Sequence, residues 1–247
     1  MRIRIHHGLL AAAAIAGAVG VVPALAQDVP DTRIVSSAKA TPSKAGTPKH
    51  PQGTSIAATA HLIVAPDLEP PIVTGIEILV GKGLTWNIGK YVTCSKQTLD
   101  RHGPKGCPPT SIMGAATATG KADTVPARLD LVFVNGGPNT TYAYATLNNP
   151  ARVRETLVVK STHMDDATWD HREVVSVPRS LQIVAGVPLQ LTAITMKIGG
   201  KPYARKFIAS TSCPAGGWKY QVTAHYLYDS LGRTADDVST GNIACTK

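Results

Sequence analysis

Short runs in which apolar and polar residues alternate fill the chain from Ile56 onward, and this pattern constrains the fold more than any other feature. A period of two residues is that of a β-strand with one buried face, because successive side chains point to opposite faces. Turn signals such as Asn-Gly-Gly-Pro-Asn at 135–139 separate the runs. We expect strands at 56–64, 72–80, 85–93, 112–119, 129–134, 141–147, 156–162, 172–177, 189–198, 203–210, 218–228 and 241–245.

The expected strands are short, and the segments between them contain little sequence that could form a helix. Only 97–102 and 180–184 could each form a single helical turn. This arrangement predicts an all-β fold, an antiparallel β-sandwich of jelly-roll-like or immunoglobulin-like type, as one domain over 55–247. Two tandem sandwiches dividing near Pro150 are the alternative, although no internal repeat supports them. Within 218–228, one face should carry Trp218, Tyr220, Val222, Ala224, Tyr226 and Tyr228.

The first 26 residues are typical of a secretory signal peptide. Arg2 and Arg4 precede an unbroken apolar run, and Ala24-Leu25-Ala26 supplies a small-residue cleavage site. An uncleaved membrane anchor is the alternative, but Pro23 interrupts the run beside the cleavage site. We therefore expect a secreted or cell-envelope protein that does not span a membrane after cleavage.

Residues 27–54 differ in composition from the chain that follows. They contain four prolines and many Ser, Thr, Ala and Lys residues, with Ile34 and Val35 as a short aliphatic pair. Such a segment buries too little apolar surface to offset the entropy lost on ordering. We expect a disordered tether there.

Four cysteines in an exported chain indicate disulfides. Three pairings are possible. We expect Cys94 with Cys107, which closes a short loop, and Cys213 with Cys245, which ties the last strand to a neighbour. Zinc is the rival interpretation, but neither pair has C-x2-C spacing and no histidine lies at ligand spacing.

The cysteine neighbourhoods form two motifs. Cys94 and Leu99 precede Cys107-Pro108 and Ser-Ile-Met-Gly-Ala-Ala-Thr-Ala at 111–118, and Cys-Pro-Ala-Gly-Gly-Trp-Lys-Tyr occupies 213–220. Together they resemble a group of uncharacterised exported, cysteine-containing β-rich proteins found mainly in high-GC actinobacteria. The resemblance covers roughly residues 72–245. It implies export and disulfides, and it implies no catalytic residue.

The formal charge of +9 is spread thinly, without any run of three basic residues. Nucleic-acid binding requires a clustered basic stripe, so we expect no nucleic-acid partner. A mild positive charge suits attraction to acidic cell-surface polymers or lipid head groups. Envelope polysaccharide is a further candidate partner. The sequence predicts no cofactor.

One polar segment, 163–171, could hold a metal ion. Asp and His side chains suit zinc or a similar metal, but the calcium-loop spacing and its glycine are absent. Eight extended residues would hold the two imidazoles more than about 20 Å apart. Without Gly or Pro, a tight reversal is disfavoured, and a turn of the Asp or Asn type is the remaining way to make one. We therefore expect a solvated loop without metal. The weak candidate ligands are His163, Asp165, Asp166, Asp170 and His171.

The same segment holds Trp169, which is a candidate ligand contact because a Trp in a polar loop needs a partner. With Tyr142 or Tyr144 it could form an exposed platform for a sugar ring. Trp218 is expected in the core, and Trp86 in the core or at its rim.

Signals for catalysis are negative. No G-x-S-x-G elbow occurs, and the four glutamates do not form an E-x-D-x-x-E strand pattern. Glu155 and Glu173 are expected to pair with the neighbouring Arg154 and Arg172. We assign no catalytic residue and predict a binding or structural module of the cell envelope or extracellular space. A hydrolase acting on extracellular or envelope polysaccharide is the alternative.

Overall fold

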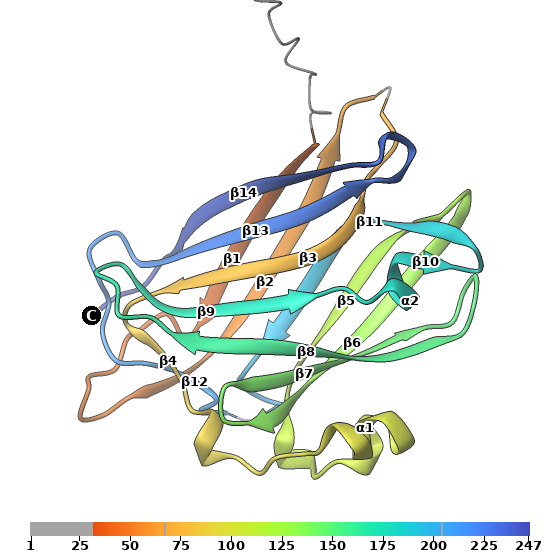
Figure 1. Ribbon diagram of the computed structural model, residues 1–247. Coiled ribbons are helices and arrows are strands. Elements are labelled where there is room, and N and C mark those ends of the chain that lie inside the picture. The colour runs from red at the N-terminus through yellow and green to blue at the C-terminus, as the bar shows by residue number, and fades with distance from the viewer. Residues whose placement is uncertain (1–31, 67, 204) are drawn as a thin grey trace, which may run out of the picture.

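The computed structural model describes residues 32–66, 68–203 and 205–247 of the 247-residue chain. The predicted signal peptide lies outside the described residues. The described chain forms 14 strands, two α-helices and four 3-10 turns (Figure 1). The helices are α1 (Lys96–His102) and α2 (Arg179–Gln182). The strands are β1 (Thr32–Thr41), β2 (Gln52–Val64), β3 (Ile72–Gly81), β4 (Leu84–Trp86), β5 (Ile112–Ala122), β6 (Val125–Gly137), β7 (Thr140–Leu147), β8 (Val153–His163), β9 (Trp169–Ser176), β10 (Ile183–Val184), β11 (Val187–Ile198), β12 (Ile208–Ser210), β13 (Trp218–Tyr228) and β14 (Arg233–Ile243).

All the named strands are hydrogen-bonded into one antiparallel sheet, so the predicted all-β class is confirmed. Its order is β14-β13-β3-β9-β8-β7-β6-β5-β11-β2-β12-β4, with β1 added beside β2 and β10 beside β11. Because β3 lies next to β13 and β5 next to β11, the residues on both sides of Pro150 share this sheet.

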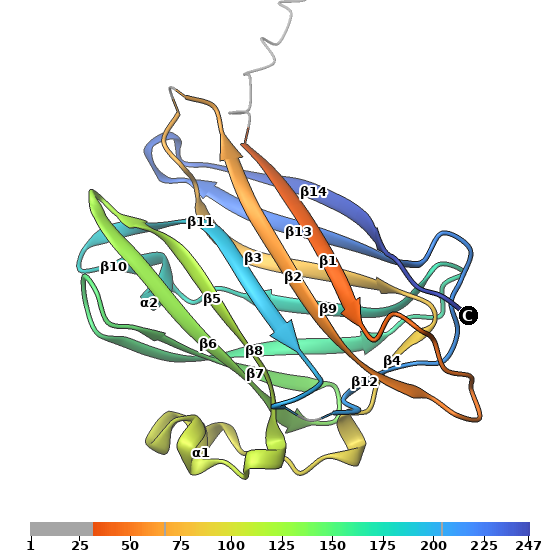
Figure 2. The same cartoon turned by 180° about the vertical axis from the view of Figure 1, so that it is seen from behind.

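The sheet folds back over itself to make two facing layers. In Figure 1, β14, β13, β3, β9 and β8 run across the front, and β1, β2, β11, β5 and β6 cross behind them at an angle. Figure 2 shows the second group from its own side. The two layers therefore come from one continuous sheet.

Side-chain contacts join the two layers along β1 and β14. The Ile34 backbone N–H donates to the Asp237 carboxylate over 2.6 Å. Two residues on, the Ser36 N–H donates to the Ser239 hydroxyl over 3.0 Å. Polar side chains of β14 thus satisfy backbone groups on the free edge of β1, as unpaired edges require.

The inner face of the sheet forms the core, and the face predicted for β13 is confirmed. Trp218 is fully buried, Tyr226 is 1% exposed, and the alternate residues are more accessible. Trp218 also donates its indole N–H to the Ser212 carbonyl over 2.7 Å. Burial of these large rings on one face fixes β13 in register.

The tether predicted at 27–54 is wrong for the described residues. Residues 32–41 form β1, which pairs with β2 from Thr32↔Val64 to Thr41↔Ser55. Its inward positions alternate as Ile34, Ser36, Ala38 and Ala40, with Ile34 and Ala40 buried. The segment therefore has the alternation of a β-strand, but most of its inward residues are small. Composition alone does not reveal such a strand.

Two other segments are less regular than predicted. The strand expected at 85–93 stops at Trp86 and continues as a 3-10 turn over Ile88–Lys90. The fully buried Asn135 holds this turn, because its amide N–H groups donate to the carbonyls of Ile88, Tyr91 and Val92. The strand expected at 203–210 shortens to β12, whereas the last strand, β14, begins well before residue 241.

Both predicted disulfides are present. Cys94 and Cys107 have Cα atoms 5.5 Å apart, and Cys213 and Cys245 have them 5.8 Å apart. The first bridge packs with Leu99 of α1 in a small satellite core. Two disulfides are typical of proteins outside the cytoplasm.

Candidate functional site

A cavity of about 310 Å³ lies between the two layers of the sheet. Small inward side chains create the space, since Ala58 and Ala60 of β2 face the cavity where larger residues would fill it. The volume is at the lower end of the range for small-molecule sites, which are mainly apolar with a few polar groups. Apolar side chains from both layers line it, among them Ile76, Ile78, Val175, Ile194 and Met196.

Glu173 on β9 brings a carboxyl group to this apolar cavity. It shares the inward parity of Val175, so strand geometry places it among apolar neighbours. The Trp86 indole N–H donates to its Oε1 over 2.6 Å, and the Ser161 hydroxyl donates to the same atom over 2.7 Å. Burial raises the pKa of Glu173, although the two hydrogen bonds act in the opposite direction.

Aromatic rings surround Trp86, which donates to this carboxyl group. Trp86 stacks with His171 at a centroid distance of 5.7 Å and with Phe207 at 6.3 Å. Tyr91 meets Phe207 edge to face, and its hydroxyl accepts from the Lys206 backbone N–H. These contacts hold the Trp86 ring, and with it the direction in which its N–H points.

The loop between β8 and β9 reverses more tightly than the sequence predicts. Asp166 makes the turn, because its carboxylate accepts from the backbone N–H groups of Thr168 and Trp169 over 2.7 and 2.9 Å. His163 consequently lies opposite His171 in the ladder, with the ring centroids 5.4 Å apart. The expectation that these imidazoles stay far apart is wrong, since a carboxylate can make the turn that Gly or Pro usually makes.

Asp170 joins the two histidines. Its Oδ2 lies 2.6 Å from Nδ1 of His171, and its Oδ1 lies 3.9 Å from Nδ1 of His163. The buried Nδ1 of His171 has no other polar partner within the described chain. Burial lowers the pKa of His171 more than the Asp170 carboxylate raises it.

The remaining candidate residues of segment 163–171 do not join His163, Asp170 and His171. Asp166 serves the turn, and Asp165 is exposed. Trp169 is half-buried at the start of β9, opposite Gly81, and is not among the residues lining the cavity. Tyr144 is buried against the Cys94–Cys107 disulfide, so the predicted platform of Trp169 with Tyr144 is not formed.

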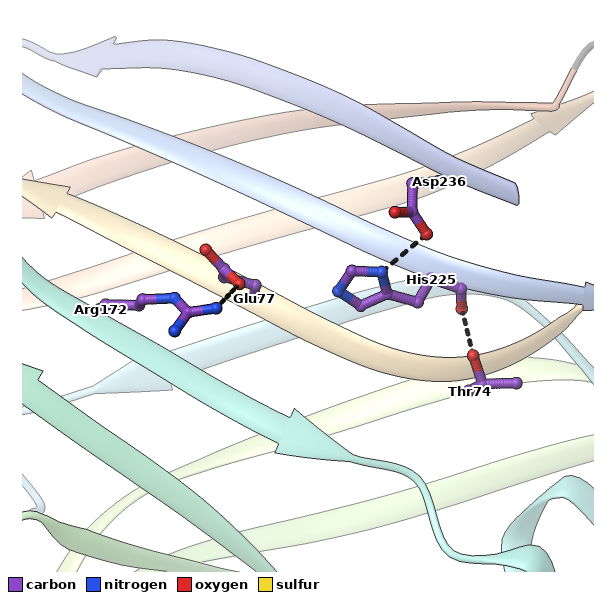
Figure 3. A network of polar contacts seen from close by, with 5 residues as sticks. All are labelled: Thr74, Glu77, Arg172, His225 and Asp236. Carbon is purple, nitrogen blue, oxygen red and sulfur yellow. Dashed lines mark hydrogen bonds and ion pairs between the residues drawn. The ribbon is translucent and has the colours of Figure 1, made fainter. Parts of the chain in front are cut away.

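The outer face of the sheet carries two cross-strand pairs, shown in Figure 3. Arg172 of β9 donates to Glu77 of β3, and His225 of β13 lies 2.7 Å from the Asp236 carboxylate of β14. The Arg172 hydrogen bond lowers the pKa of Glu77. Beside them, the Thr74 hydroxyl donates to the His225 carbonyl. Surface pairs of this kind each contribute about 0–1 kcal/mol, which fits a structural role.

The expected glutamate–arginine pairs are not formed. Arg172 contacts Glu77 instead of Glu173, and Glu155 accepts from the Ser180 hydroxyl over 2.7 Å. Adjacent residues on a strand point to opposite faces, so neither glutamate can easily reach the arginine beside it. The same alternation was the signal by which Glu173 could have been assigned to the interior.

Comparison with known protein families, with curated proteins and with solved structures finds no match for the chain. Within the described residues, no helix has both the length and the apolar character needed to cross a membrane.

Proposed function

We propose that this protein is an exported binding protein that carries one small, mainly apolar molecule in the cavity between its two layers. The cavity itself is the observation that supports the proposal most strongly. A space of about 310 Å³ lined by aliphatic side chains favours apolar ligands, because their transfer from water is favourable. Export is inferred from the signal-peptide pattern and is consistent with the two disulfides.

The ligand is proposed to carry a polar group that meets Glu173. Both protein hydrogen bonds to this carboxyl end on Oε1, which leaves Oε2 without a partner in the described chain. A hydroxyl group suits this position, since it can accept from a protonated carboxyl and donate to an ionised one. A mainly apolar alcohol is therefore the proposed class of ligand.

This chemistry favours binding over the polysaccharide alternatives. A glycosidase needs two carboxyl groups across the scissile bond, and Glu173 is the only carboxyl among the described residues lining the cavity. Polysaccharides expose many hydroxyls, which an aliphatic lining would leave without hydrogen-bond partners.

A neutral fluorescent probe, N-phenyl-1-naphthylamine, tests the proposal. Ala58→Phe places a ring in the cavity, and Ala57→Phe places the same ring on the exposed face of the same strand. We expect the wild type and Ala57→Phe to bind the probe with equal affinity, and Ala58→Phe to bind it at least about tenfold more weakly. Equal binding by both variants would refute the cavity as the site. Ala60→Leu, a smaller intrusion, provides the test if Ala58→Phe does not fold.

A further inference from the structure

We propose that His163, Asp170 and His171 together bind a divalent transition-metal ion, for which zinc is the best fit. One ligand atom from each residue lies within 4.8 Å of the others, at the end of the β8–β9 hairpin. This site is separate from the cavity, and the proposal does not depend on what the cavity binds.

The backbone brings these three side chains together in two steps. The ladder places His163 directly opposite His171, and the Met164 N–H donates to the Asp170 carbonyl over 2.8 Å to close the hairpin. Asp170 is an extra residue in the pairing of β9 with β3, where Val80↔His171 is followed by Gly81↔Trp169. Such a bulge lets consecutive side chains leave the usual alternation, so that Asp170 and His171 can approach one point.

The set of donor atoms selects the metal. Two imidazole nitrogens and one carboxylate oxygen suit zinc, whereas calcium and magnesium prefer oxygen ligands. Around a tetrahedral zinc ion, ligand atoms are about 3.3 Å apart, so the 3.9 Å separation of His163 from Asp170 must contract and the 2.6 Å contact of His171 with Asp170 must lengthen. His163 can make this adjustment because its side chain is 71% exposed, and that exposure also leaves a coordination position for water.

His171 adds a second observation. Its buried Nδ1 lies 2.6 Å from the Asp170 carboxylate and has no other polar partner in the described chain. A metal ion bound by this nitrogen and by Asp170 would take the place of that contact, and the stacking of His171 on Trp86 holds the ring in place for it.

Isothermal titration of untagged, EDTA-treated protein with zinc, without any apolar ligand, tests the site. We expect one ion per chain. His163→Ala should weaken binding by about tenfold or more, since changes even outside the primary ligands cost 10–100-fold. This exposed residue can be removed with little effect on folding.

His225→Ala is the matched control, because His225 also lies against a carboxylate on the surface but has no second histidine in its pair. Its zinc affinity should equal that of the wild type. Absence of zinc binding by the wild type, or equal affinities of His163→Ala and His225→Ala, would overturn the proposal. Asp170→Asn gives a second test, with the same expected loss as His163→Ala.

Discussion

The indole N–H of Trp86 donates a 2.6 Å hydrogen bond to the carboxyl group of Glu173, 87 positions later in the chain. β4, which ends at Trp86, is the last of the twelve strands in the sheet order, whereas β9 is the fourth from the other end. The bond therefore ties two strands that are far apart in the sheet order and orients the carboxyl group within the cavity.

Trp86→Phe tests the contribution of this hydrogen bond. The ring can still stack with His171 and Phe207, but the buried carboxyl loses one of its two donors. We expect the free energy of unfolding to fall by about 1–3 kcal/mol, as measured by urea denaturation. Phe207→Leu, which disturbs the stack and keeps the donor, separates loss of packing from loss of the bond. An unchanged midpoint in Trp86→Phe would show that the bond contributes nothing to stability.

Glu173→Gln should make stability less dependent on pH. Burial raises the pKa of Glu173 above its unfolded value of about 4.5, so the folded protein binds this proton more tightly than the unfolded chain does. The wild type should then lose stability relative to the variant as the pH rises from 4.5 through the folded pKa, and the difference should level off above it. Each unit of pKa displacement corresponds to about 1.4 kcal/mol.

Urea denaturation between pH 3 and 9, in EDTA to exclude bound metal, measures this difference. A wild type that gains stability relative to Glu173→Gln with rising pH would contradict the direction. Glu77→Gln gives the opposite sign as a control, because the Arg172 hydrogen bond lowers the pKa of Glu77. Its stabilising contribution is present above pH 4.5 and is lost as the pH falls through the folded pKa.

Asp237→Ala should loosen the contact between β1 and β14. The Asp237 carboxylate accepts from the Ile34 N–H, whereas its neighbour Asp236 contacts the half-exposed His225. We expect Asp237→Ala to cost about 1–2 kcal/mol and to speed hydrogen exchange at the Ile34 amide. Asp236→Ala should leave that amide unchanged. Equal exchange in the two variants would refute a specific role for Asp237 at this seam.

The two disulfides should differ in their contributions to stability. Cys213–Cys245 closes a loop with a sequence separation of 32 residues, compared with 13 for Cys94–Cys107. On the loop-closure model, removing them should cost about 4 and about 3 kcal/mol respectively. Paired Cys→Ala variants measure this by urea denaturation, and a larger loss for the shorter loop would contradict that model.

Periodicity was sufficient to predict the all-β class and most of the strands. Regions such as 218–228 alternate large apolar and polar residues, and their strands appear close to where they were predicted. β1 escaped prediction because its inward residues are mainly Ser and Ala, which resemble a linker in composition. The turn after Trp86 escaped because the buried Asn135, far away in the chain, determines it.

The candidate sites depend on contacts that no local pattern contains. The cavity exists because one sheet folds over itself, and this closure involves contacts between β1 and β14, which are about 200 residues apart. The His163–His171 pair depends on the turn that Asp166 makes. The sequence identified these residues as candidates, but it did not predict that the two imidazoles lie close together. The alternation within 169–176 could have assigned Glu173 to the inner face of the sheet. It could not have predicted that Glu173 lies beside Trp86.

Methyl NMR of the full mature chain during titration with N-phenyl-1-naphthylamine tests the central claim most directly. Ile194 and Met196 line the cavity, whereas Ile63 is 55% exposed on the outer surface. If the cavity is the binding site, the methyl signals of Ile194 and Met196 will shift saturably with the probe, and those of Ile63 will stay in place. Saturable shifts at Ile63 with none at Ile194 and Met196 would contradict the account.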